Sequence, residues 1–107
     1  MRADQLMKLI RQLTDPDTRQ RELGADRVTD WVSSYSKTER RLLAGILSIS
    51  AACEQHHGTL EAQLHALLEL GASGLTNFES IAHLREIDLT TLPGSLSEYV
   101  EDLLNTS

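Results

Sequence analysis

Apolar residues recur at helical spacing along most of the chain and divide it into six segments. The clearest repeat spans residues 59–70, where Leu60, Leu64, Leu67 and Leu68 stand at i, i+4, i+7 and i+8. Similar stripes occur in the other segments, so each is expected to form a helix with one face turned inward. The predicted helices cover residues 3–13, 16–34, 37–56, 59–70, 78–87 and 96–105.

Capping residues mark several of the expected boundaries. Ser36 and Glu39 have the S-x-x-E form of a capping box, and Ser95 and Glu98 repeat it, so a helix is expected to start at both places. Gly71 fits the position just beyond a helix C-terminus, which predicts a loop over residues 71–76. Asn77 is then expected to cap the fifth helix.

The segment from Arg41 to Cys53 carries no charge after its first residue. A helix that is apolar on nearly every side is usually buried on nearly every side, so we expect this one to form the centre of the core. Changing Leu42, Ile46 or Leu47 to Ala is then expected to cost about 2 to 5 kcal/mol. Cys53 is expected to be a small buried hydrophobe.

The six segments together predict an all-α fold. About six helices are expected in three stacked antiparallel pairs, forming a single helical domain over residues 1–107. The aromatic content of 4% favours packing through small residues over a β-sandwich. Helix pairs of this size recur in α-solenoids, where each pair buries its face by stacking on the next.

The composition predicts a cytoplasmic protein. The first residues lack the uninterrupted apolar stretch of a signal peptide, and the apolar run at residues 42–53 is shorter than the roughly 20 residues of a membrane span. Cys53 is the only cysteine, so no intramolecular disulfide can form, and a lone thiol suits a reducing compartment.

Charge is distributed unevenly along the chain, whose net charge is −6. Residues 1–58 hold nine Lys and Arg against eight Asp and Glu, whereas residues 59–107 hold only Arg85 against eight acids, a balance of −7. A surface of one negative sign repels nucleic acids and anionic membranes and attracts a basic partner.

The sequence LTDPD at residues 13–17, followed by a helix with Arg19 and Arg21 in its first turns, resembles the turn between the two helices of a HEAT repeat. The resemblance implies an aspartate-proline turn, with an early arginine bonding back to acidic or carbonyl groups of neighbouring turns. The second pair departs from this pattern at His57-Gly58-Thr59, and Glu61 stands where an arginine would be expected.

The layout of the whole chain extends this resemblance. Three pairs, with LEAQLHALLELGASG at residues 60–74 and a tail formed by residues 87–89 and 98–104, resemble small HEAT-like immunity proteins encoded beside bacterial polymorphic toxins. That family implies a non-catalytic inhibitor, without a cofactor, that binds a cognate toxin domain. Many such toxins are nucleases with a positive cleft, and charge complementarity would speed their association with an acidic inhibitor.

In HEAT-like stacks the second helix of each pair lines the concave face, which implies one broad binding surface. The simpler interpretation is that its charged residues are the solvated faces of amphipathic helices. The near absence of Lys and Arg among them favours a shared surface. The expected partner-binding residues are Asp26, Asp30, Tyr35, Glu61, His65, Glu69, Glu98, Tyr99, Glu101 and Asp102.

Three aromatic residues could anchor a partner. Trp31 and Tyr35 lie one helical turn apart, and the alternative is that they close the end of the core. Trp31 fits the core better than the interface, whereas Tyr35 is the stronger anchor of the two. Tyr99 lies beside the acidic tail and could play either part.

No motif for metal binding or catalysis stands out. Cys53, His56, His57 and His65 are ligand types, but neither C-x-x-C nor H-E-x-x-H occurs. Nucleophile and phosphate-binding glycine motifs are also missing. We therefore expect no metal, no cofactor and no enzymatic activity.

Two other functions are compatible with the sequence. The first is an α-helical scaffold or adaptor for protein–protein interaction whose acidic tail only keeps it soluble. The second is a DNA-binding helix-turn-helix within residues 16–55, which the interleaved acids argue against. That site would use Arg19, Arg21, Arg27, Arg40 and Arg41.

Overall fold

The computed structural model describes residues 1–72 and 78–105, and within these ranges every regular element is a helix. The all-α prediction is therefore confirmed. The α-helices are α1 (Ala3–Leu13), α2 (Thr18–Asp30), α3 (Lys37–Cys53), α4 (His57–Ala72) and α5 (Gly94–Asn105). Three 3-10 helices complete the order: η1 (Val32–Ser34), η2 (Phe78–Glu86) and η3 (Leu89–Thr91).

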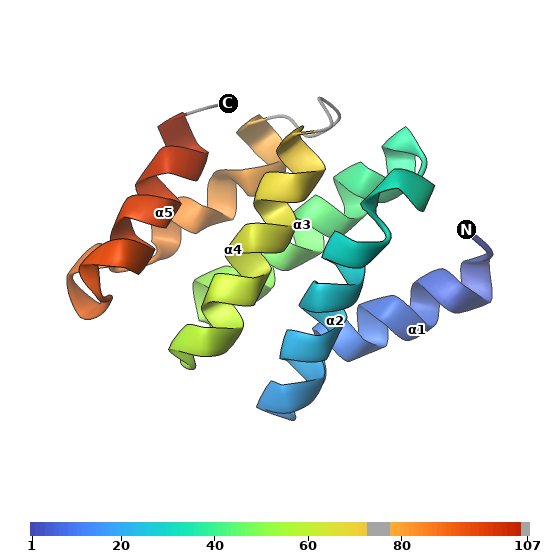
Figure 1. Cartoon of the computed structure of the whole chain (residues 1–107), viewed down its shortest axis with the longest axis horizontal. Coiled ribbons are helices and arrows are strands. Elements are labelled where there is room, and N and C mark those ends of the chain that lie inside the picture. Colours follow the sequence, from blue (N-terminus) through green and yellow to red (C-terminus); the bar gives the residue numbers. More distant parts are fainter. Residues whose placement is uncertain (73–77, 106–107) are drawn as a thin grey trace.

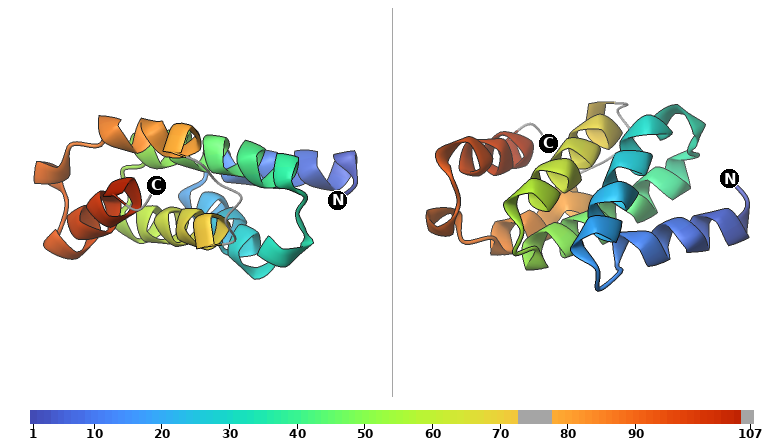
Figure 2. Two further views of the ribbon diagram at one scale, coloured as in Figure 1. Left: turned by 90° about the horizontal axis from the view of Figure 1, so that it is seen from above. Right: turned by 60° about the horizontal axis from the view of Figure 1, so that its bottom comes forward.

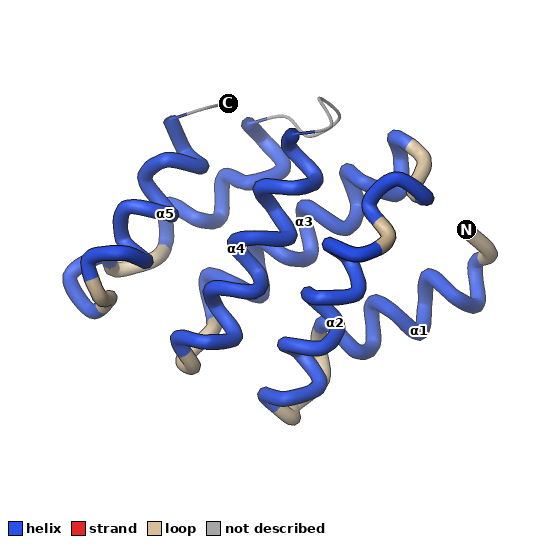
Figure 3. The backbone as a smooth tube through the Cα atoms, in the orientation of Figure 1, coloured by secondary structure: helices blue, strands red, loops and turns tan. Residues whose placement is uncertain are grey.

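The helices lie in two layers. Figure 1 looks onto the layer formed by α2, α4 and α5, and Figure 2 shows α1, α3 and η2 side by side in the layer behind it. The tube in Figure 3 shows the same arrangement, with short loops between successive helices. The shortest dimension of the molecule is 19 Å, which matches two helices of about 10 Å diameter.

Contacts link neighbours within and between the layers. Helix α1 contacts α2, α3 contacts α4, and η2 contacts α5, so each of the three predicted pairs is in contact. Along the layers, α2 packs on α4, α4 on α5, α1 on α3, and α3 on η2. The core between the layers is filled mostly by leucines: Leu9, Leu13, Leu43, Leu47, Leu60, Leu64, Leu67, Leu70, Leu84, Leu96 and Leu103.

Helix α3 is buried on one side only, which contradicts the prediction of a helix enclosed on nearly every side. Leu43 and Leu47 are fully buried, but Leu42 is 44% exposed, Ile49 is 50% exposed, and Cys53 is exposed as well. The reason is its position in the middle of a layer: α1 and η2 lie beside it and α4 behind it. No segment in the described ranges covers its outer face. Leu47 has the full burial that the expected cost of about 2 to 5 kcal/mol requires, whereas Leu42 lacks it, so the expectation no longer applies to Leu42.

The local capping signals had mixed outcomes at the helix starts. The capping box at Ser36 is present, because the Ser36 hydroxyl accepts a bond from the Glu39 N–H at 3.2 Å and the Glu39 carboxylate accepts one from the Ser36 N–H at 2.8 Å. The second expected box is wrong. Helix α5 already begins at Gly94, and the Pro93 carbonyl accepts the N–H groups of Leu96 and Ser97.

Other boundaries shifted by one to four residues. Helix α2 begins at Thr18, because the Asp17 side chain accepts the N–H of Arg19 and caps it there. Helix α3 ends at Cys53, and α4 begins at His57 and runs past Gly71, so Gly71 is not a C-terminal cap. The cap expected at Asn77 lies outside the described residues.

The Arg21 side chain joins the first two helix pairs through a closed set of hydrogen bonds. Its Nε and one Nη donate to the two carboxylate oxygens of Glu54 at 2.8 and 3.0 Å. The remaining N–H groups donate to the carbonyls of Asp15 and Pro16, both at 2.9 Å, and to the Thr18 hydroxyl at 3.2 Å. All five guanidinium N–H groups therefore have an acceptor.

The Glu54 carboxylate is satisfied equally well, although its side chain is only 1% exposed. Besides Arg21, it accepts the backbone N–H of His56 at 3.3 Å and the side-chain amide of Gln63 at 3.0 Å. Burial by itself raises the pKa of Glu54, but these hydrogen bonds and the Arg21 charge outweigh it and lower the pKa. One ion pair thus ties the α1–α2 turn to the α3–α4 turn.

We expect Arg21→Ala to lower the free energy of unfolding by about 3 kcal/mol, since it leaves the Glu54 carboxylate buried without its cation. Urea denaturation followed by circular dichroism measures this value. Arg19→Ala is the matched control, because Arg19 is an exposed arginine of the same helix that pairs with Glu22 at 2.7 Å. That change should cost less than about 1 kcal/mol. If both variants lowered the free energy of unfolding equally, the bonds between Arg21 and Glu54 would contribute no more than an exposed ion pair.

Gly24, inside α2, allows α1 and α2 to cross closely. A Cβ at this position would lie 3.2 Å from the Leu13 backbone nitrogen and from the Gln12 and Leu13 side chains. Gly45 in α3 offers the opposite case, because a Cβ there would meet nothing within 4 Å.

We expect Gly45→Ala to raise the free energy of unfolding by about 0.5 to 1 kcal/mol, since alanine is the better helix former. Gly24→Ala should instead lower it, because α1 must move to make room. Thermal unfolding of both variants tests this pair. A gain in stability at Gly24 would mean that the crossing tolerates a side chain.

Candidate interaction surface

The layer of α2, α4 and α5 gathers the acidic residues that the sequence singled out. We call the following set the acidic surface, adding Glu22 for the reason given below: Glu22, Asp26 and Asp30 of α2, Glu61, His65 and Glu69 of α4, and Glu98, Tyr99, Glu101 and Asp102 of α5. Most of these side chains are exposed, and Glu22, Glu69 and Tyr99 are half-buried. Figure 1 shows that their three helices lie side by side.

Electrostatic coupling shows that the α2 and α4 parts of this surface are close neighbours. Burial, followed by the charges of Glu22 and Asp30, raises the pKa of Asp26, and Arg19 and His65 act in the opposite direction. An open groove of about 350 Å³ separates the two helices and is lined by Glu22, Asp26, Gly58, Glu61, Ala62 and His65. Gly58 lines this groove, where a Cβ would lie 3.2 Å from the His56 ring and in van der Waals contact with the Glu22 carboxylate at 3.6 Å.

A hydrogen bond continues the surface from α4 to α5. The Tyr99 hydroxyl lies 3.2 Å from Nδ1 of His65, and Nε2 of His65 lies 3.8 Å from the Glu69 carboxylate. Burial and then the charges of Glu61 and Glu69 raise the pKa of Tyr99, so its hydroxyl stays neutral and can donate to the imidazole. Tyr99 therefore sits among the acids of α4.

Two aromatic residues exchange the roles that the sequence favoured for them. Tyr35 is only 5% exposed, and its hydroxyl donates to the carbonyl of Arg27 at 3.4 Å, so it belongs to the core and the expectation of a surface anchor is wrong. Burial, with the charges of Glu39 and Asp30, raises the pKa of Tyr35 to about 12. Trp31, expected in the core, is 58% exposed. The cause is that α2 ends at Asp30 and a 3-10 turn redirects the chain.

Sequence reasoning missed two members of this face. Glu22 lines the groove and stands at i, i+4 and i+8 with Asp26 and Asp30, a spacing that could have revealed it. Leu68 was read as an inward residue of α4 but is 41% exposed, three positions after His65 on the same helix. It supplies an apolar contact at the edge of the acidic surface.

Within residues 1–72 and 78–105, no group of three or more His, Cys, Asp or Glu side chains has a geometry that could hold a metal ion. No helix in these ranges combines the length and apolarity that a bilayer crossing requires. No protein-family model matches the chain, and neither the curated proteins nor the solved structures that were compared contain a match. The interpretation of this surface therefore depends on its own chemistry.

We expect Asp26→Asn to stabilise the protein slightly at pH 7, by up to about 0.5 kcal/mol because the side chain is exposed. A raised pKa means that the charged form is disfavoured in the folded state. The cost is absent below the unfolded pKa of about 3.9 and appears as pH rises through the folded pKa. The gain should therefore vanish near pH 3.5, which urea denaturation at the two pH values tests.

Glu39→Gln is the control of opposite sign. The backbone N–H of Ser36 lowers the pKa of Glu39, so its carboxylate stabilises the fold above its unfolded pKa and this contribution is lost as pH falls. The variant should lose stability at pH 7. If Asp26→Asn also lost stability at pH 7, the charged form of Asp26 would not be unfavourable in the folded protein, contrary to our expectation.

Proposed function

We propose that the protein is an immunity protein that binds a basic toxin domain through its acidic surface and thereby blocks the toxin. The observation that carries the proposal is the charge of the exposed layer. Helices α4 and α5 contain five acids and neither Lys nor Arg. Burial and then the charges of Glu22 and Asp30 raise the pKa of Asp26, and perturbed pKa values of this kind cluster at functional sites. The partner would be a basic cleft, such as that of a nuclease.

The architecture supports the resemblance from which this function was inferred. We propose that the three contacting pairs are antiparallel HEAT-like repeats of a short α-solenoid, and that α2, α4 and α5 are their second helices. Arg21 makes the bonds that the resemblance implies for an early arginine, to two turn carbonyls and to an acid of the next turn. The acidic surface would then be the face on which such stacks bind partners.

Binding of this kind needs anchors as well as charge. Charge complementarity chiefly accelerates association, whereas a few desolvated side chains hold the complex together. Leu68, which is 41% exposed, and the half-buried Tyr99 are an apolar and an aromatic group beside the acids of α4. The groove between α2 and α4 could admit a basic side chain of the partner between Asp26 and Glu61.

The test is growth rescue: cells that express a toxin encoded by the adjacent gene should grow only when this protein is also expressed. Glu61→Lys with Glu98→Lys should abolish rescue and slow association with the purified toxin domain about tenfold or more at low salt. Asp4→Lys with Glu86→Lys is the matched control, since it changes the net charge equally but on α1 and η2 in the other layer. The control should rescue growth and associate normally.

If no toxin gene adjoins this one and no basic protein is captured from the lysate, the immunity function is wrong. An adaptor would then be the better interpretation. One observation favours it: Leu42, Ile46, Ile49 and Cys53 form a partly exposed apolar stripe on the outer face of α3. An adaptor that uses this stripe would be insensitive to both charge-reversal variants.

A further inference from the structure

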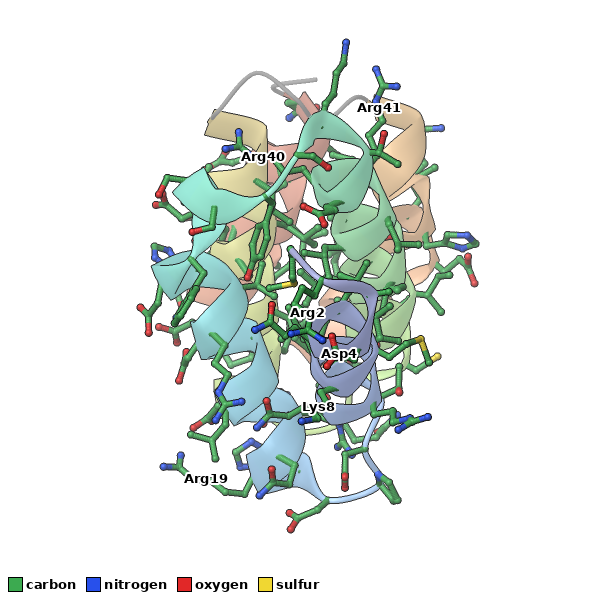
Figure 4. The ribbon with its side chains drawn as sticks, turned by 90° about the vertical axis from the view of Figure 1, so that its right-hand side faces the viewer. Arg2, Asp4, Lys8, Arg19, Arg40 and Arg41 are labelled. Carbon is green, nitrogen blue, oxygen red and sulfur yellow. The ribbon has the colours of Figure 1, made fainter. Side chains whose placement is uncertain are left out.

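A second groove lies at the N-terminal end of the molecule, away from α5, and its charge has the opposite sign. It has a volume of about 350 Å³ and is lined by Met1, Gln5, Lys8, Leu9, Arg27, Trp31 and Tyr35. The charged side chains in this lining are both basic, in a protein whose net charge is −6. Figure 4 looks at this end and labels Lys8 on α1, next to α2.

The two cations of the groove have no internal partner. Lys8 and Arg27 are exposed, and neither forms an ion pair or a side-chain hydrogen bond with any residue that the structure describes. Three cations of residues 1–58 are paired, Arg2 with Asp4, Arg19 with Glu22 and Arg21 with Glu54. Arg11, Lys37, Arg40 and Arg41 form no ion pair with the described residues, but they do not line the groove. Lys8 and Arg27 are therefore available to an anionic ligand.

The rest of the lining is apolar and aromatic. The floor is formed by Leu9 and Tyr35, which are almost fully buried, and Trp31 forms a wall that is 58% exposed. An exposed tryptophan beside unpaired cations is the composition of a recognition site, because the ring supplies contact area and the cations supply orientation.

From this lining we infer that the groove binds a short acidic peptide segment of a partner protein, with carboxylates on Lys8 and Arg27 and an apolar side chain against Trp31. The volume lies at the lower end of the range for ligand pockets, about 300 to 1,000 Å³, which suits a few residues. Asp30 and Glu39 lie close enough to raise the pKa of Tyr35, after burial, so they limit how much negative charge the groove accepts. A short acidic segment with an apolar side chain therefore fits the groove better than the continuous charge of a nucleic acid. This inference does not depend on the proposed function.

Trp31 is the only tryptophan, so its fluorescence reports directly on the groove. The probe is a five-residue peptide, EELEE, with blocked ends, titrated at low salt. We expect a saturable change in Trp31 emission. The neutral peptide QQLQQ should bind at least about tenfold more weakly, because it cannot form the ion pairs.

Lys8→Gln with Arg27→Gln should weaken the binding of EELEE about tenfold or more. Arg11→Gln with Arg41→Gln is the matched control, since it removes the same charge from exposed sites outside the groove. The control should bind within about twofold of the unchanged protein. Circular dichroism of both variants verifies that they are folded.

Several results would overturn the inference. Binding that survives in Lys8→Gln with Arg27→Gln, or equal affinity for EELEE and QQLQQ, would exclude recognition of acidic residues. Equal affinity for inorganic phosphate or a short DNA strand would assign the groove to phosphate groups. A change in Trp31 emission with protein concentration alone would show that a second copy fills it. No change with any probe would mean that the groove binds none of them.

Discussion

The ion pair between Arg21 and Glu54 is the constraint on which the arrangement of the layers depends. A buried carboxylate is tolerated only when its charge and lone pairs are satisfied, and Glu54 obtains this from Arg21, His56 and Gln63 together. These groups come from α2, the α3–α4 turn and α4. If α2 slid along α4 by one turn, the guanidinium would lose both of its bonds to Glu54 and keep only those to its own turn. The pair therefore selects one register among several that leucines alone would permit.

That register sets the acidic surface. With α2 fixed against α4, Glu22 and Asp26 face Glu61 and His65 across a shared groove, and the repulsion among the acids is part of the folded state. The buried apolar core and the Arg21 network stabilise the fold enough to offset this repulsion. A surface that lowers stability and yet is held in one geometry is more consistent with binding than with solubility alone.

Features decided within a few residues could be predicted from the sequence, and features decided by neighbours could not. The capping box of Ser36 and Glu39 needs only its own turn and was correct. The apolarity of α3 was read as complete burial, but the number of neighbours decides burial, and Leu42 and Ile49 face outward from the middle of a layer. Ser95 is not the cap because α5 begins at Gly94, and the carbonyl of Pro93, two residues before Ser95, already accepts the first helical N–H groups.

The candidate site followed the same division. The apolar stripe of each helix was clear in the sequence, so the helical periodicity predicted that the acids lie on outward faces. It could not predict which of these faces lie next to one another. The pair of Trp31 and Tyr35 shows the limit: one turn of 3-10 helix after Asp30 turned one ring outward and the other inward. Predicting that turn would require knowing where α2 ends, and the end of a helix is the feature that apolar periodicity locates least accurately.

The acids of α5 and the two cations of the basic groove cannot pair within one molecule. The acids of α5 lie at one end of the layer and the groove of Lys8 and Arg27 at the other, with α4 and α2 between them (Figure 1). Because they are far apart and exposed, a ligand at the α5 acids would not cover Lys8 and Arg27, and a ligand at the groove would not cover the α5 acids.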